Sequence, residues 1–304
     1  MYSSKSVDEA ALFRQMQPYV LTTQRQELNG FPRPDPYNKD KAIINSKNIS
    51  QSRSNSGVRL ASDKRICDRC SAIYQIDYRG MPLGGDCFYH WGRSYQRRGY
   101  KTPYTCCNRD SNSAGCTVNK WHISENLDNL RGFVRTVEKP QPADGNFGIY
   151  ALDCEMCYTT EGGEALRVTV VSSDLKIVYD TLIKPISPVL DYNTRFSGIT
   201  EYDLTYCNTT MKDVQTFLLD TLSDKTILIG HSLDGDLRAL RLIHDTVIDT
   251  SVVFPHSQGP PFKRALKTLC QEYLHKTIQI DGGGHNCVED AKSCMELMIW
   301  KINH

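Results

Sequence analysis

Two carboxylates, Asp153 and Glu155, stand one residue apart directly after an apolar, β-prone run at residues 149–152. Side chains alternate between the two faces of a strand, so both carboxylates point to the same side. Burying two unpaired negative charges costs free energy. Mg²⁺ is a suitable partner because it takes oxygen ligands and lets substrate phosphates complete its shell. The alternative is an exposed strand end that carries two solvated acids.

Two further acids occupy positions where a helix would hold them near its apolar face. Asp236 lies within residues 233–240, where leucines recur at helical spacing. Asp290 falls in the first turn of a helix whose start is predicted by Asn286 and Glu289, which resemble a capping box. An acid in a first turn gains from the helix dipole but needs a partner if it is buried.

His285 stands five residues before Asp290 and directly after three glycines, residues 282–284. Glycines favour a mobile loop, which a gating residue can use. An imidazole titrates near neutrality, which suits a general base. We therefore interpret Asp153, Glu155, Asp236 and Asp290, together with His285, as one candidate site for hard cations.

A second kind of chemistry is predicted by Cys and His residues between positions 67 and 122, where eight soft or borderline ligands suffice for two tetrahedral zinc sites. Closed four-ligand sites leave no position for substrate, so we expect structural zinc. The alternative is a set of ordinary buried thiols and a core histidine. Our preferred pairing is Cys67, Cys70, Cys87 and His90 for one ion and Cys106, Cys107, Cys116 and His122 for the other, with a mixed pairing left open.

Aromatic and basic residues are interleaved among these ligands. Basic groups pair with phosphates and rings stack on bases, so the pattern is typical of a surface for single-stranded nucleic acid. The alternative is a small module that buries its aromatics and uses its arginines for solubility. The residues concerned are Tyr89, Trp91, Arg93, Tyr95, Arg97, Arg98, Tyr100, Lys101 and Tyr104.

The C-terminal half alternates strand and helix patterns, which predicts an α/β fold with a sheet flanked by helices. Short apolar runs that are rich in β-branched residues predict strands, and apolar residues at helical spacing predict helices. We expect strands at 149–152, 166–172, 176–184, 227–230 and 247–248, and helices at 211–222, 233–240, 263–273 and from 286 onward.

Charge and composition divide the chain into three parts. The net charge is +1, but residues 58–139 carry 14 Lys and Arg against 8 Asp and Glu, whereas residues 140–304 carry 14 against 22. A basic middle suits an anionic partner, and an acidic end suits cations. We predict a flexible N-terminal extension at 1–60, with a short helix near its start at 8–16 and a Ser-rich linker at 46–56. A Cys/His zinc-binding module at 61–138 and a catalytic domain at 147–304 follow it.

Several segments of the chain resemble one enzyme group, the DEDDh 3′→5′ exonucleases, which have a ribonuclease-H-like fold. The similarity rests on residues 151–156, 195–200 and 229–237, and on His285, which four intervening residues separate from Asp290. Within that group the chain is most similar to the eukaryotic RNA exonuclease 1 family, the antigen-GOR-like proteins. That similarity continues upstream through residues 87–92 and through Cys106 and Cys107, and so covers roughly residues 65–304.

The resemblance implies a hydrolase that removes nucleoside 5′-monophosphates from the 3′ end of single-stranded RNA, in RNA processing or decay. It implies two Mg²⁺ or Mn²⁺ ions, about 4 Å apart, held by Asp153, Glu155, Asp236 and Asp290. His285 would be the general base. The segment that grips the terminal nucleotide is expected to use Met156, Arg195, Ser197, Gly198 and Ile199. DNA degradation and a catalytically silent zinc protein that binds RNA or protein are the rival hypotheses.

The remaining expectations concern location and partners. No apolar run approaches the ~18 residues that span a bilayer, so we expect no membrane insertion. The first residues lack an apolar segment of the secretory type, so we expect the protein not to be secreted. Nuclear localisation is the first expectation and a cytoplasmic one the alternative. Protein partners would bind the zinc module or the N-terminal extension.

Overall fold

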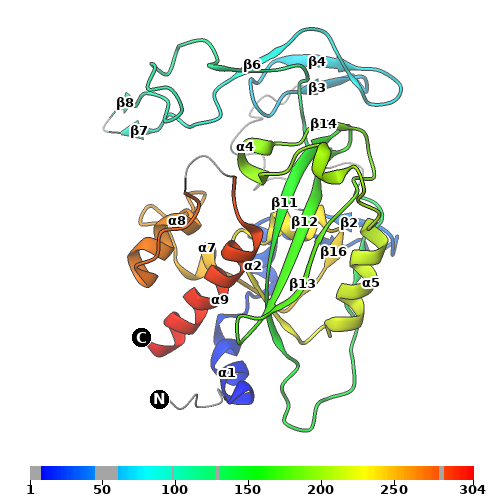
Figure 1. Cartoon of the computed structure of the whole chain (residues 1–304), viewed down its shortest axis with the longest axis vertical. Helices are drawn as coiled ribbons and strands as arrows, with labels where there is room; N and C mark the ends of the chain where they lie inside the picture. The colour runs from blue at the N-terminus through cyan, green and yellow to red at the C-terminus, as the bar shows by residue number, and fades with distance from the viewer. Residues whose placement is uncertain (1–7, 45–60, 98, 127–129, 281–283) are drawn as a thin grey trace.

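The computed structural model describes residues 8–44, 61–97, 99–126, 130–280 and 284–304. A central sheet with helices on both faces forms the larger part of the molecule, and a smaller Cys/His module lies at one end of that sheet (Figure 1). Within the described residues no helix is both long and apolar enough to cross a membrane. The serine-rich segment predicted as a linker, 46–56, lies outside the described residues.

The central sheet is mixed and has the strand order β13-β12-β11-β15-β17. Strands β11 (Ile149–Thr159), β12 (Gly162–Ser172) and β13 (Ile177–Leu182) form an antiparallel meander. Strands β15 (Ile227–Gly230) and β17 (Val247–Asp249) run parallel to β11. Short β14 (Val189–Asp191) pairs with the far end of β11. This arrangement confirms the predicted ribonuclease-H-like α/β fold.

Alternating side chains of β11 fill two cores, one on each face of the sheet. Ile149 and Ala151 pack with the last helix, α9 (Cys287–Asn303), on one face. Leu152 packs on the other face with α5 (Met211–Thr221) and α6 (Asp234–Ala239). Both cores are built from fully buried aliphatic side chains, whose transfer from water is the main stabilising term.

The helix boundaries follow local capping chemistry. Thr210 forms a complete capping box with Asp213 at the start of α5. Asn286 caps α9 by accepting from the N–H groups of Val288 and Glu289, while the Glu289 carboxylate accepts instead from the N–H of Gln279. The helix predicted at 263–273 is shorter and irregular. It consists of α8 (Leu266–Leu269) and the π-helical η4 (Cys270–Leu274), and α7 (Thr250–Val253) precedes it.

Residues 8–44 pack onto the central sheet, so the prediction of a flexible extension at 1–60 is wrong for this part. The predicted short helix is confirmed as α1 (Glu9–Met16), whose Leu12, Phe13 and Met16 enter the α9 core. After the short turn η1 (Gln17–Tyr19), the N–H of Leu21 donates to the carbonyl of Val247 at 2.9 Å. Helix α2 (Thr23–Leu28) and the hairpin β1 (Arg33–Pro34) with β2 (Ala42–Ile43) complete this segment.

The Cys/His module consists of small hairpins with little apolar core. Among its described residues, a buried hydrophobic cluster centres on Cys67, Tyr74 and Cys87. The predicted boundary at 138 is too late, because β10 (Val134–Arg135) pairs with β16 (Leu242–Ile243) of the C-terminal half. The strands of the module are β3 (Lys64–Ile66), β4 (Ile73–Ile76), β5 (Pro82–Leu83), β6 (Cys87–Tyr89), β7 (Gln96–Arg97), β8 (Tyr100–Lys101) and β9 (Thr117–Asn119).

Candidate active site and metal centres

Strand β11 carries the first two predicted carboxylates. Glu155 is buried, with 6% of its surface exposed, and Asp153 is partly buried. Oε1 of Glu155 is buried and has no hydrogen-bond partner in the described part of the chain. A buried charged oxygen without a partner is costly unless a cation or a proton compensates it.

Helix α6 brings Asp236 to the same place. The chain leaves β15 and turns at Ser232, whose φ of +56° is in the left-handed region. Asp236 is 5% exposed, and its Oδ1 accepts from the N–H of Cys154 at 2.9 Å. Cys154 lies between Asp153 and Glu155 in the chain, so this bond holds the third acid against the strand that carries the first two.

Asp290 enters from the first turn of α9. It is 2% exposed, and its Oδ2 accepts from Nε2 of Gln279 at 2.8 Å. Nδ1 of His285 lies 3.9 Å from the same oxygen. Oδ1 of Asp290 is buried and lacks a hydrogen-bond partner among the described residues, as does the Glu155 oxygen. The first turn of α9 therefore supplies the buried acid that the sequence predicts.

The four acids lie close enough to influence the protonation of one another. Burial raises the pKa of Asp153 well above its usual range, and Asp236, Asp290 and Glu155 raise it further. Burial, followed by Asp290 and Asp236, raises the pKa of Glu155 to about 8. Burial raises the pKa of Asp290 to about 6 and that of Asp236 well above its usual value. Such mutual repulsion is relieved by a divalent cation, and the two unpartnered oxygens fit that role.

A thiol that sequence reasoning missed lies beside these acids. Cys287 is fully buried, and its Sγ donates to the carbonyl of Asp153 at 2.9 Å. One ligand atom each from Cys287, Asp153 and Glu155 lie within 4.8 Å of one another. The sequence contains a signal for this contact. Cys287 is three residues before Asp290 and therefore lies on the same side of the predicted helix.

His285 is held through its backbone. Its N–H donates to the carbonyl of Phe196 at 2.6 Å, and the two rings meet edge to face at 5.9 Å. Burial, with a contribution from Lys267, lowers the pKa of His285. Gly284 has a φ of +75°, and a Cβ there would lie 2.5 Å from Cα of Gly198. Gly284 is therefore required for close packing, while Gly282 and Gly283 of the predicted mobile loop lie outside the described residues.

The residues predicted to grip a nucleotide lie on and around α4 (Thr194–Ser197). The side chains of Ser197 and Ile199 are buried; the Ser197 hydroxyl donates to the carbonyl of Tyr192, and Ile199 packs in a small core. Met156 is partly exposed and Arg195 is exposed, with the Arg195 guanidinium 4.7 Å from the ring centre of Trp91. Met156 and Arg195 thus present accessible side chains, while Ser197, Gly198 and Ile199 shape the loop.

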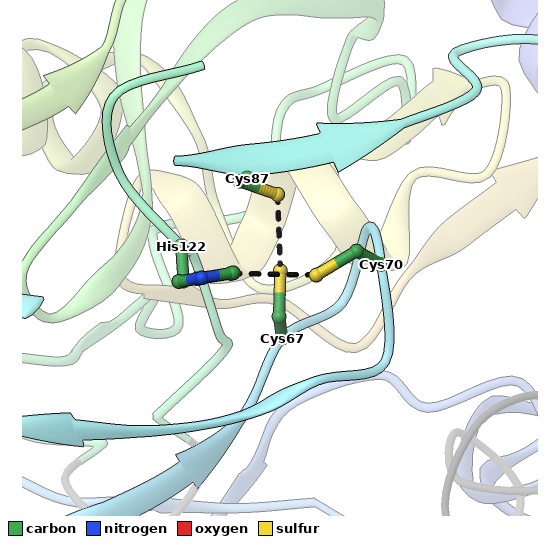
Figure 2. A group of neighbouring side chains, drawn as sticks. All are labelled: Cys67, Cys70, Cys87 and His122. Carbon is green, nitrogen blue, oxygen red and sulfur yellow. Dashed lines mark hydrogen bonds between the residues drawn. The ribbon is translucent and has the colours of Figure 1, made fainter. Parts of the chain in front are cut away.

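The Cys/His residues form two groups of four, but the two histidines are exchanged relative to the preferred pairing. One group is Cys67, Cys70, Cys87 and His122, and the other is His90, Cys106, Cys107 and Cys116 (Figure 2 shows the first). The reason is geometric. Cys87 lies on strand β6 and His90 directly follows that strand, and residues three apart along an extended strand face opposite sides. Antiparallel pairing of β6 with β9 brings the segment that leads to His122 beside Cys87 instead.

The contacts within each group suit a tetrahedral metal. In the first, the sulfurs of Cys67 and Cys87 are 3.7 Å apart, and Sγ of Cys70 is 3.3 Å from Nδ1 of His122. The neighbouring Cys87 thiol lowers the pKa of Cys67 to about 3, which favours a thiolate. The mixed pairing left open by the sequence is therefore the one that the structure has.

In the second group, Nδ1 of His90 lies 3.5 and 3.4 Å from the sulfurs of Cys106 and Cys107. Its Nε2 donates to the carbonyl of Ser113 at 3.2 Å, which leaves the Nδ1 lone pair directed at the thiols. The ring also stacks on Tyr104 with centroids 3.7 Å apart. Both groups fit zinc, which takes Cys and His ligands in sets of four.

The module contacts the C-terminal half through a partly buried ion pair. Arg69 lies between two ligands of the first group, and its guanidinium is 2.6 Å from the carboxylate of Asp191 on β14. It also lies over the rings of Tyr89 and Tyr158, at 4.6 and 4.8 Å. Nδ2 of Asn119 donates to the same carboxylate at 2.8 Å. These contacts hold the module against the end of the sheet.

Some residues of the predicted nucleic-acid surface are exposed, and others are partly buried in contacts within the module. Tyr95, Tyr100 and Trp91 are 52%, 81% and 37% exposed, so these rings are available for stacking. Tyr89 and Tyr104 are partly buried and contact Arg69 and His90 instead. Arg93 and Lys101 are exposed. The side chains of Arg97 and Arg98 lie outside the described part.

The chain is similar to known proteins over most or nearly all of its length. No family model matches the chain. It is 46% identical to the human RNA exonuclease 1 homolog over 96% of this chain and 24% of that protein. It is 44% identical to the human putative exonuclease GOR, over 99% of this chain and 44% of the relative. RNA exonuclease 3 of Schizosaccharomyces pombe is 39% identical over 80% of this chain and 45% of the relative.

The chain spans less than half of the length of each of these relatives. Among solved structures, the Neurospora crassa Pan2 catalytic unit is similar over 56% of this chain and 30% of its own, with a TM-score of 0.46 and 25% identity. The Saccharomyces cerevisiae apo Pan2 module gives a TM-score of 0.45 and 19% identity, over 56% of this chain and 31% of its own.

Proposed function

Because the chain belongs to the eukaryotic RNA exonuclease 1 family, we propose that it is a metal-dependent 3′→5′ exoribonuclease. Its substrate is the 3′ end of single-stranded RNA, and its role is in RNA processing or decay. The observation that carries the proposal is the convergence of Asp153, Glu155, Asp236 and Asp290, drawn from three distant segments, with His285 beside the last of them.

The four carboxylates would hold two Mg²⁺ or Mn²⁺ ions, and the buried oxygens of Glu155 and Asp290 are the strongest candidates for ligand atoms. Bound cations of this kind lower the pKa of water and offset the charge on the departing oxygen. Asp236 holds its position by accepting from the Cys154 N–H, and Gln279 orients Asp290. The chain's own residues therefore preorganise the site before substrate arrives.

His285 would take the proton from the attacking water. The imidazole is 39% exposed at the edge of the acid cluster, and burial lowers its pKa, so the neutral form that accepts a proton predominates near pH 7. The water oxygen bonds to phosphorus while the bond from phosphorus to the 3′-oxygen breaks. The products are a nucleoside 5′-monophosphate and a strand with a new 3′-hydroxyl.

The terminal nucleotide would lie between Met156, the α4 loop and the acids. Arg195 supplies positive charge there, and a contact with the 2′-hydroxyl would favour RNA over DNA. The two Cys/His groups would each hold one structural zinc ion, which keeps the basic module folded where it can attract the strand. We also propose that the protein acts in the nucleus.

The test is degradation of a 5′-labelled single-stranded RNA with Mg²⁺, with Mn²⁺ and with EDTA. We expect a ladder of products shortened from the 3′ end and released nucleoside 5′-monophosphates, only with metal. A 3′-phosphorylated RNA should resist cleavage, and the matching DNA should be degraded more slowly. Internal cleavage of a circular RNA, or full activity in EDTA, would contradict the proposal. Equal activity on DNA would contradict only the preference for RNA.

A further inference from the structure

We infer that Trp91 of the Cys/His module is a positioning residue for His285, and that the second Cys/His group thereby helps to assemble the active site. The inference rests on the proposed function. It is carried by a continuous line of contacts that runs from His90 through Trp91 and Phe196 to His285, across the boundary between the two halves of the molecule.

The first step is the anchoring of Trp91 to the ligand group. His90, directly before it, contacts the sulfurs of Cys106 and Cys107. Gly92, directly after it, lies so close to the Cys106 backbone that a Cβ would be 2.4 Å from the Cys106 nitrogen. Two further bonds join Arg93 and Thr105, at 3.0 and 3.1 Å. Trp91 thus projects from a backbone that is held on both sides by the group.

The second step is the contact of Trp91 with α4. Its indole meets the ring of Phe196 edge to face, with centroids 6.1 Å apart and planes at 72°. The guanidinium of Arg195 lies over the same indole at 4.7 Å. Aromatic pairs in this geometry and cations over the face of an indole are both attractive. The indole therefore restrains two consecutive residues of α4.

The third step is the contact of α4 with His285. The carbonyl of Phe196 accepts the N–H of His285, and the Phe196 ring meets the imidazole edge to face at 5.9 Å. At 3.9 Å the imidazole and the Asp290 carboxylate are beyond hydrogen-bond distance, so contact with Phe196 contributes to the ring's orientation. A displacement of about 1 Å at a proton-transferring group can cost a hundredfold in rate.

The competing role for Trp91 is direct stacking on a base of the RNA, since the indole is 37% exposed. The two roles make different predictions. A stacking residue contributes to substrate binding whether or not His285 is present. A positioning residue acts through His285 and loses its effect when that side chain is removed.

The experiment is a double-mutant cycle of Trp91→Ala and His285→Ala in the full chain, measured as single-turnover rate and substrate affinity. We expect Trp91→Ala alone to lower the rate about tenfold to a hundredfold, with substrate affinity changed less than about twofold. In the His285→Ala background it should have no further effect. Phe88→Ala is the matched control, because Phe88 is a 60% exposed ring on strand β6 of the same module.

Hydrogen exchange gives a readout that does not need activity. The His285 amide should exchange faster in Trp91→Ala than in the wild type, while Trp91→Phe should retain both slow exchange and most of the rate. If Trp91→Ala fails to fold, Phe196→Leu tests the next contact in the line.

The inference is overturned if Trp91→Ala weakens RNA affinity equally in both backgrounds, or if it changes neither rate nor exchange. Should the wild type not degrade RNA at all, the proposed function fails. The exchange of the His285 amide then decides by itself whether Trp91 positions this loop.

Discussion

The two halves of the molecule build their sites in opposite ways. In the C-terminal half, for which we propose nuclease activity and which we call the nuclease half, residues as far apart as Asp153 and Asp290 meet because two large apolar cores hold the sheet, α6 and α9 together. In the Cys/His module, ligands from one short segment meet around a core of three buried residues, two of which are themselves ligands. The apolar cores of the first half are sufficient to build its site, whereas we expect the second half to fold only when its Cys and His groups hold metal.

The difference implies separate failure modes. Loss of an acid should abolish chemistry and leave the sheet intact, because the acids oppose one another and are not part of either core. Loss of a Cys or His ligand should unfold the module, because little else holds it. The contrast between loss of chemistry and loss of folding can be tested by several changes, of which removal of zinc has the largest expected effect.

Removal of zinc should have the largest effect, because structural zinc contributes about 10 kcal/mol or more to folding of small modules. Native mass spectrometry should find two zinc ions in the wild type and one in Cys70→Ser. The double variant Cys70→Ser with His122→Ala should still hold one ion, whereas Cys70→Ser with His90→Ala should hold none. One ion in the latter variant would contradict the observed grouping. Cys207→Ser, a partly buried cysteine outside both groups, is the control.

Asp153→Asn should lower the rate by on the order of 10³-fold, since one member of the cation-binding set loses its charge. The melting temperature of the nuclease half should stay the same or rise, because one of several mutually repelling buried acids becomes neutral. The measurements are RNA degradation with Mg²⁺ and thermal unfolding. Asp174→Asn, a surface acid paired with Lys176, should change neither. A large loss of stability in Asp153→Asn would show that the acids also hold the fold.

Arg69→Ala should destabilise the contact between the halves by about 3 kcal/mol. The reason is that the carboxylate of Asp191, which is largely shielded from solvent, loses its guanidinium partner. We expect proteolysis to cut more readily between the module and the sheet, while both zinc ions stay bound. Asp191→Asn should have a smaller effect, since the amide still faces Asn119. Unchanged protease resistance in Arg69→Ala would mean that other contacts hold the module.

The smallest expected effect is an opposite response to pH in the two halves. Without divalent cations, the pKa of Glu155 is raised to about 8 in the folded protein, so its contribution to stability is present below about pH 4.5 and lost as pH rises through 8. The metal-free nuclease half should thus melt a few degrees lower at pH 8 than at pH 6. Mg²⁺ should remove this slope, and Glu155→Gln should reduce it, because Asp153 and Asp236 also have raised pKa values.

The module should respond with the reverse sign, because zinc binds deprotonated thiols and its affinity rises with pH. Thermal unfolding followed by a probe in each half, at pH 6 and pH 8 with zinc retained and Mg²⁺ withheld, measures both slopes. If the melting temperatures of the two halves change with pH in the same direction, the contrast is wrong. The nuclease half would then not be held by its apolar cores alone, or the module would not depend on bound metal.

Much of the nuclease half was predictable because its signals are local. The apolar run before Asp153, the helical spacing around Asp236 and the capping residue Asn286 each determine an element within a few residues. The N-terminal segment was misjudged because its composition is polar. Its three buried anchors on α1 are few and find their partners almost 300 residues away on α9.

The sequence by itself determined the residue types of both candidate sites: four acids and a histidine, which suit hard cations, and eight Cys and His residues, which suit zinc. It also determined the alternation of strand and helix, since the periods of both structures are set by the local backbone. Only the tertiary structure decided which histidine joins which cysteines and that Cys287 lies against Asp153. It also decided that Trp91 contacts Phe196, which in turn contacts His285. Those contacts depend on how β6 pairs with β9 and how distant segments pack, and no local pattern encodes such pairings.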